Sequence, residues 1–218
     1  MMLTPVNLND KPDGYVITAA EKVLIDSGPD AVTMRTVASE AGVTATALYR
    51  HFADKDALLR ALVRKVHSQF KARLPVHDPA VEPARELERA WRAYFDFGIE
   101  QPQFYRLLFV ATHGIGIDRF PEDFRKGKSS TFRQLTSAIS ACITDGSIRG
   151  DAPVHEIGLS MFAHMHGLMM LHLAGRFSGD HALFRSFAMR AMRRSFIARN
   201  RSGGSPPRTR RAGRTIKR

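Results

Sequence analysis

The stretch that decides the fold is TMRTVASEAGVTATALYRHFADKDALLRALV, residues 33–63. Thr33 and Thr44 each stand directly before a short segment with helical periodicity, and threonine is a favoured N-cap residue. Gly42 follows the first of these segments, at the place where helices commonly end in a left-handed residue. The stretch therefore predicts two short helices joined by a tight turn, which is the pattern of a helix-turn-helix.

The second of these helices has one apolar face and one face free for contacts. If Leu48 points inward, a rotation of about 100° per residue brings Phe52 to the same side. Thr46 and Arg50 then point outward, with Tyr49 beside them. An arginine can fork onto a guanine edge or a phosphate, and hydroxyl groups can donate to phosphates. The outer face therefore fits DNA, and Arg50 is the candidate for reading a base.

The same stretch resembles the N-terminal helix-turn-helix of the TetR/AcrR transcriptional regulators. The shared features are a threonine opening the first helix, the Ala-Gly-Val turn at 41–43, the Leu-Tyr-x-His-Phe end at 48–52, and a lysine opening the next helix. The resemblance implies that the partner is double-stranded operator DNA. The outward positions and the resemblance together give the candidate DNA contacts, which are Thr33, Arg35, Thr44, Ala45, Thr46, Tyr49, Arg50, His51 and Lys55.

Helical periodicity continues through the rest of the chain, and strand signals are nearly absent. Pro102, Pro121 and Pro153 stand at or near expected helix starts, where a missing N–H is tolerated. We therefore predict an all-α fold. The expected helices cover about 14–27, 33–41, 44–52, 54–74, 83–100, 103–113, 121–145, 153–176 and 180–199.

Composition shifts suggest where the chain divides. The proline-rich segment 75–82 is the expected domain boundary, and seven of the net twelve positive charges fall within 201–218. The expected parts are an N-terminal helix-turn-helix domain at 1–53, a connecting helix at 54–74, an effector-binding and dimerisation domain at 75–200, and a disordered basic tail at 201–218.

Location and redox chemistry follow from what the sequence contains. No apolar run approaches the roughly 20 residues that a membrane-spanning helix needs, and the first residues lack the layout of a secretion signal. The single cysteine, Cys142, fits a reducing compartment and a buried structural role. These features favour a cytoplasmic protein without membrane association.

The second half of the chain carries further patterns. Helix 153–176 is apolar nearly all round, so it should face its own core and also a second subunit. The segment 102–109 and the pair His166-Gly167 resemble a TetR subgroup whose C-terminal domain carries a Trp-x-x-x-His-Gly signature. Phe162 stands here in place of that tryptophan.

The resemblance implies a pocket for a small, mostly apolar effector inside the helical bundle. Methionine side chains can re-pack around varied apolar ligands, although a stripe of methionine and aromatic residues can equally be plain core. The pocket candidates are Phe95, Phe104, Leu108, Phe109, His113, Met161, Met165 and Met169.

The resemblance also implies a homodimer formed by the last two long helices. A dimer suits a helix-turn-helix, because two recognition helices can then read two half-sites about one turn of DNA apart. The candidate interface residues are Phe162, His166, Met170, Leu183, Phe187 and Ala191.

The four histidines of helix 153–176 do not form a metal-binding pattern. His164 and His166 are two positions apart and point in nearly opposite directions on a helix, and no cysteine or carboxylate accompanies them at ligand spacing. We therefore expect neither a metal nor a cofactor.

The sequence as a whole predicts a ligand-responsive transcriptional regulator, a repressor that its effector releases from the operator. Activation fits the same residues. Two alternatives stay open: a helix-turn-helix DNA-binding protein without an effector, and an enzyme built on a helical bundle. The second alternative would need a convergent catalytic set, and the sequence presents none.

Overall fold

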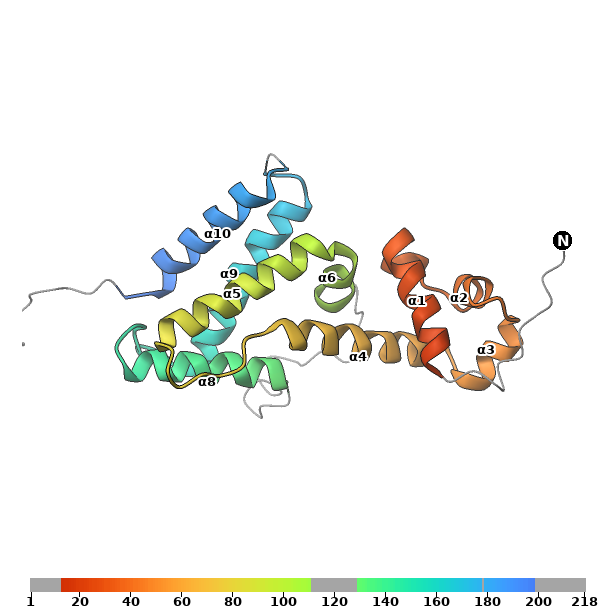
Figure 1. Ribbon diagram of the computed structural model, residues 1–218, viewed down its shortest axis with the longest axis horizontal. Coiled ribbons are helices and arrows are strands. Elements are labelled where there is room, and N and C mark those ends of the chain that lie inside the picture. The colour runs from red at the N-terminus through yellow and green to blue at the C-terminus, as the bar shows by residue number, and fades with distance from the viewer. Residues whose placement is uncertain (1–12, 111–128, 178, 199–218) are drawn as a thin grey trace, which may run out of the picture.

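The computed structural model describes residues 13–110, 129–177 and 179–198, and every regular element in these ranges is helical (Figure 1). This architecture confirms the predicted all-α fold class. Within the described residues, no helix is long and apolar enough to cross a bilayer. In chain order the elements are α1 (Asp13–Ser27), the 3-10 helix η2 (Pro29–Ala31), α2 (Met34–Glu40), α3 (Ala45–His51), α4 (Lys55–Arg73), α5 (Pro83–Glu100), α6 (Pro102–Phe109), α8 (Ser130–Thr144), α9 (Val154–Leu173) and α10 (His181–Phe196).

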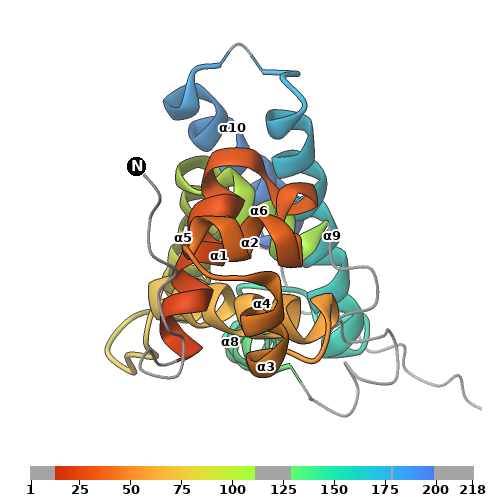
Figure 2. The same ribbon diagram turned by 90° about the vertical axis from the view of Figure 1, so that its right-hand side faces the viewer.

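The helices gather into two groups joined by one long helix. α1, α2 and α3 lie at one end of the molecule, and α5, α6, α8, α9 and α10 form a bundle at the other (Figure 1). α4 runs from the α3 end into the bundle. Viewed along the long axis, α1, α2 and α3 lie in front of the bundle (Figure 2). α4 therefore joins α3 to the bundle through one continuous helix.

The N-terminal group has a small apolar core of its own. Val16 and Leu24 of α1, Val37 of α2, Leu48 of α3 and Leu62 of α4 are all fully buried. Each such side chain contributes about 1.5–3 kcal/mol when it leaves water. Because side chains from all four helices meet in this core, the turn between α2 and α3 is held in a fixed geometry.

The core of the bundle is built where α5 packs on α9 and α10. Trp91 and Phe95 of α5 are fully buried, and the Trp91 Nε1–H donates to Sδ of Met161 on α9 at 3.2 Å. Gly98 allows Met169 to approach closely, since a Cβ at position 98 would lie 2.5 Å from the Met169 Sδ. Two distant parts of the sequence are thus locked together along α5.

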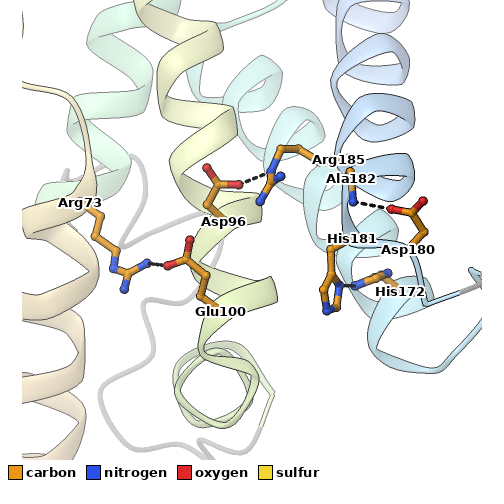
Figure 3. Close-up of polar contacts among 8 residues, drawn as sticks. All are labelled: Arg73, Asp96, Glu100, His172, Asp180, His181, Ala182 and Arg185. Atoms are coloured by element: carbon orange, nitrogen blue, oxygen red, sulfur yellow. Dashed lines mark hydrogen bonds and ion pairs between the residues drawn. The ribbon is translucent and has the colours of Figure 1, made fainter.

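Polar contacts tie α4 to both groups. Glu21 of α1 accepts hydrogen bonds from Lys65 Nζ at 2.6 Å and from Gln69 Nε2 at 2.5 Å. Further along α4, Arg73 Nη1 lies 2.6 Å from a carboxylate oxygen of Glu100 on α5 (Figure 3). Exposed ion pairs contribute little stability each. Their value here is that they set the position of α4 relative to its neighbours.

α6 forms a second bridge between the groups, because it packs against α1 and η2 as well as α4 and α5. Gly28 ends α1, with its N–H donating to the Leu24 carbonyl at 2.9 Å and its φ at 83°. A Cβ at position 28 would lie 3.3 Å from Oε1 of Gln103 on α6. A glycine here satisfies both the left-handed backbone and the close approach of α6.

Some helix ends differ from those that the sequence predicts. The described part of the helix expected over 121–145 begins at Ser130, because the Ser129 hydroxyl accepts a hydrogen bond from the Phe132 N–H at 3.3 Å. The preceding part of that prediction lies outside the described residues. α6 ends before the predicted residue 113.

The last two helices are shorter than the sequence predicts. α9 stops ahead of the predicted 153–176 limit, since Gly175 takes the left-handed conformation with φ 71°. α10 starts one residue inside the predicted 180–199, because Asp180 Oδ1 accepts hydrogen bonds from the N–H groups of Ala182 (Figure 3) and Leu183. In both cases a local capping residue decides the boundary.

Candidate nucleic-acid interface and ligand cavity

The start of α2 is fixed by a reciprocal cap. The Thr33 Oγ1 accepts the Thr36 N–H at 3.1 Å, and the Thr36 Oγ1 accepts the Thr33 N–H at 3.0 Å. This arrangement satisfies two backbone donors at the helix start. Arg35, in the first turn of α2, is exposed, and Thr33 itself is half-buried.

The turn between α2 and α3 depends on Gly42. Its φ is 66°, and its N–H donates to the Ser39 carbonyl at 3.1 Å, while the Val43 N–H donates to the Ala38 carbonyl at 3.0 Å. A side chain at this position would be strained in the left-handed region. The turn therefore sends the chain into α3 within a few residues of the end of α2.

α3 divides its side chains between a buried and an exposed face. The Thr44 hydroxyl caps it by accepting the Ala47 N–H at 3.1 Å. Leu48 is fully buried and Phe52 is 8% exposed, so this face holds α3 to the core. Tyr49 is 53% exposed, which leaves its ring and hydroxyl accessible to a partner.

The predicted DNA contacts therefore lie on one end of the molecule. Thr33 and His51 are half-buried there, and His51 has a further contact within the chain. The exposed members of the predicted set are Arg35, Thr44, Ala45, Thr46, Tyr49, Arg50 and Lys55. α3 stands at the end of the molecule farthest from the bundle (Figure 1), so a duplex can approach it. The contacts themselves stay a prediction.

A fixed three-helix unit in which a tight turn joins α2 to α3, with the outer face of α3 exposed, defines a helix-turn-helix module. Residues 16–62 match the bacterial regulatory proteins of the tetR family, and residues 87–194 match the tetracyclin repressor-like C-terminal domain. The chain therefore belongs to the TetR family and is a helix-turn-helix transcriptional regulator, as its sequence predicts.

Individual relatives agree with this assignment. The chain is 27% identical over 182 residues to the HTH-type transcriptional regulator HbdR of Aromatoleum sp. strain CIB, covering 81% of this chain and 78% of that protein. It is 24% identical over 160 residues to the HTH-type transcriptional regulator TtgR of Pseudomonas putida, covering 71% of this chain and 76% of that protein. A TetR family regulator structure from Marinobacter aquaeolei VT8 superposes with a TM-score of 0.63 at 24% identity, covering 85% of this chain and 95% of that one, which supports the fold.

The bundle contains a cavity of about 550 Å³ that is partly open to solvent, within the usual range for sites that bind small molecules. Its walls come from α4, α5, α6, α8, α9 and the connections at Leu74–His77 and Ser129. Aliphatic and aromatic side chains dominate, with a few polar groups among them. The lining residues are Val63, His67, Phe70, Leu74, Pro75, His77, Pro83, Glu86, Leu87, Ala90, Trp91, Tyr94, Leu108, Phe109, Ser129, Thr131, Phe132, Gln134, Leu135, Ser137, Ala138, Ala141, Phe162 and Met165.

The predicted pocket residues that the structure describes fall into two groups. Leu108, Phe109 and Met165 line the cavity. His113 lies outside the described residues. The others are buried in the core and do not belong to the lining, namely Phe95, Phe104, Met161 and Met169.

The α5 residues that line the cavity were not among the predicted pocket residues, which included only Phe95 of this helix. Glu86, Ala90 and Tyr94 lie on one stripe at intervals of four, and Leu87 and Trp91 lie beside them. This helical spacing is visible in the sequence. It shows that the five side chains share a face, but only the packing shows that the face borders a cavity.

A buried chain of hydrogen bonds adjoins the cavity. The Tyr94 and Tyr105 hydroxyl oxygens are 2.7 Å apart, and the Tyr105 hydroxyl is 2.7 Å from Nδ1 of His166. Burial raises the pKa of both tyrosines, well above 10 for Tyr94, and burial lowers the pKa of His166 below its ordinary value of 6.5. Near neutral pH all three groups are therefore uncharged, so the chain holds no unpaired buried charge.

The predicted dimer residues differ in how far they are exposed. Leu183 and Phe187 of α10 are 52% and 41% exposed. Met170 and Ala191 are half-buried. Phe162 lines the cavity and stacks on His166, with ring centroids 5.7 Å apart, so these two side chains pack within their own protomer.

Two histidines meet where α9 turns into α10. His172 Nε2 lies 3.1 Å from Nδ1 of His181 (Figure 3). The His172 ring also stacks on Phe184, with ring centroids 4.0 Å apart. Burial, with the nearby His181, lowers the pKa of His172. Across the part of the chain that the structure describes, no three side chains of metal-ligating type come together.

Proposed function

We propose that two copies of this chain form a dimer that binds operator DNA through paired α3 helices, and that a small ligand in the cavity releases the DNA. The observation that carries this proposal is the position of α4. Its first residue, Lys55, stands beside α3, while Val63, His67 and Phe70 further along line the cavity. A ligand that displaces the cavity end of α4 would therefore displace the DNA-binding end as well.

The DNA step uses the exposed face of α3 in the major groove. Arg50 supplies the fork that can read a guanine, and Tyr49, Thr46 and Lys55 supply phosphate contacts. The small side chain of Ala45 lets the helix backbone approach the groove. Such an interface binds DNA through both charge and shape.

The dimer step uses the exposed apolar side chains of α9 and α10. Leu171 of α9 is 49% exposed, and Leu183 and Phe187 of α10 are similarly exposed. Large apolar side chains exposed together mark an interaction surface. We centre the proposed interface on these three residues, because they are the most exposed large apolar side chains of α9 and α10. A two-fold dimer would present two α3 helices to half-sites about 34 Å apart.

The proposed outcome is repression in the cytoplasm, with release by the ligand. A ligand can shift the dimer only by binding one geometry more tightly than the other. The sign of regulation depends on where the operator lies, and a relative matched over 101 residues, FasR of Mycolicibacterium smegmatis, is a transcriptional activator. The cavity favours a ligand-responsive protein over one without an effector.

The DNA-binding proposal is tested with the double variant Tyr49→Ala, Arg50→Ala. Genomic fragments selected by the purified wild-type protein supply the operator, and a mobility-shift assay then compares affinities. We expect specific binding to be lost while size-exclusion chromatography with light scattering still shows the dimer. Arg176→Ala, an exposed arginine beyond α9, is the matched control and should bind normally. Unchanged operator binding by the double variant would refute the assignment of α3.

The dimer proposal is tested separately with Leu183→Arg, Phe187→Arg. Charged side chains on this face should convert the dimer to a monomer in sedimentation velocity, with unchanged helical content by circular dichroism. A dimer that persists in this variant would show that the interface lies on another face of the protein.

A further inference from the structure

The cavity carries one acidic group at its wall. Glu86 is the single carboxylate among the described lining residues, and none of those residues is a lysine or an arginine. Its side chain is only 13% exposed. A carboxylate removed from water to this extent needs hydrogen-bond donors or a cation beside it.

A single side-chain donor, His77, contacts the Glu86 carboxylate. His77 Nδ1 lies 2.8 Å from Oε2 and 3.0 Å from Oε1, so one ring nitrogen serves both oxygens. The His77 side chain is 73% exposed, on the connection between α4 and α5. Because a carboxylate can accept about four hydrogen bonds, Glu86 has capacity left for a ligand.

The negative charge of Glu86 affects Cys142, a buried residue of α8. Burial raises the pKa of the Cys142 thiol to about 12, and the negative charges of Asp145 and Glu86 add to this effect. An anion in the cavity would meet the same repulsion, whereas a cation would be attracted.

The stripe of α5 that lines the cavity sets the shape of a matching ligand. Glu86 lies near the helix start, and Tyr94 lies eight residues further along, a rise of about 12 Å. Trp91 lies between them, and Phe132 of α8 contributes a further ring to the wall. The cavity thus has an acidic end and an aromatic end.

We infer that the effector of this regulator is an amphipathic organic cation, with an amine or quaternary ammonium head at Glu86 and an apolar body among Trp91, Phe109 and Phe132. This inference rests on the proposed function, in which the cavity is the effector site. Aromatic faces also attract cations, so the walls favour the same ligand class. A competing feature is the N-terminus of α8 at Ser129, which would favour an anion.

The test uses three probes with one chain length and different heads: n-decylamine, n-decanol and decanoate, each below its aggregation threshold. Trp91 is the only tryptophan of the chain and lines the cavity, so its fluorescence reports binding to the full-length protein. We expect decylamine to bind at least about tenfold more tightly than decanol or decanoate, as for a hydrogen bond to a charged group.

The variant Glu86→Gln should lower the affinity for decylamine about tenfold and leave that for decanol unchanged. Glu88→Gln is the control, because Glu88 lies on the same helix and pairs with Arg193 outside the cavity. It should leave all three affinities unchanged.

Three results would overturn the inference: decanoate binding as tightly as decylamine, an equal loss of decylamine and decanol binding in Glu86→Gln, or no fluorescence response to any probe. These readouts concern binding alone. Decylamine binding that depends on Glu86 without any change in operator affinity would instead refute the proposed effector function and leave the ligand class supported.

Discussion

The hydroxyl of Tyr105 on α6 lies 2.7 Å from Nδ1 of His166 on α9. These residues belong to the two motifs, 102–109 and 162–167, by which the second half of the sequence resembles a TetR subgroup. Tyr105 is fully buried, and its hydroxyl also meets that of Tyr94 on α5. One hydroxyl group therefore joins three helices at the edge of the cavity.

Replacing Tyr105 with phenylalanine should lower the free energy of unfolding by about 1–3 kcal/mol, because His166 and Tyr94 would each lose a buried partner. Urea denaturation followed by circular dichroism measures the change. Tyr49→Phe removes a hydroxyl from an exposed ring and should have no effect on stability. Equal stability of Tyr105→Phe and the wild type would show that the hydrogen-bond chain contributes nothing.

Acidification should destabilise the protein in a window that begins near pH 6.5. The pKa values of His166 and His172 are lowered in the fold, so the unfolded chain takes up these protons first as the pH falls. The two neutral histidines therefore contribute their full stabilisation above the ordinary histidine pKa of 6.5. The free energy of unfolding declines as the pH falls from there toward the lowered pKa values of the folded state. Urea midpoints measured between about pH 7.5 and pH 5 check this, and the variant His166→Asn, His172→Asn should show a smaller decline.

The backbone conformation that ends α1 can be tested at Gly28. Gly28→Ala should destabilise the fold by about 1–3 kcal/mol, because φ 83° with ψ 175° is a backbone region almost confined to glycine and the added Cβ would lie 3.3 Å from Gln103 Oε1. Thermal unfolding measures the loss. The control is Gly14→Ala, which adds a methyl group to an exposed helical position with nothing near it and should be neutral or slightly stabilising. A neutral Gly28→Ala would show that the positive φ of residue 28 does not constrain the end of α1.

Arg50 and Lys55 should differ in what their loss does to DNA binding. Arg50→Ala should cost about 1–3 kcal/mol on the operator and relax specificity at one base position. Lys55→Ala should weaken binding to all sequences equally and reduce the slope of affinity against salt concentration by about 1. Titrations of operator and scrambled duplexes at several salt concentrations separate the two. Identical profiles for both variants would contradict the assignment of base reading to Arg50.

The helix-turn-helix was predictable because the signals that build it are local. Thr33 and Thr44 cap their own helices within three residues, and Gly42 ends α2 by its own backbone conformation. The period of Leu48 and Phe52 identifies the buried face of α3 without reference to any distant residue. An exposed Tyr49 and Arg50 follow from the same period.

The sequence by itself thus determined the helices, the turn and the outward face of α3. Only the tertiary structure decided which apolar residues of the bundle border empty space: Phe162 and Trp91 face the cavity, whereas Met169 fills the gap left by Gly98. Helical periodicity gives the direction of a side chain on its own helix. Whether that direction meets core, cavity or solvent depends on neighbours far away in the chain, and packing among several helices fixes these neighbours.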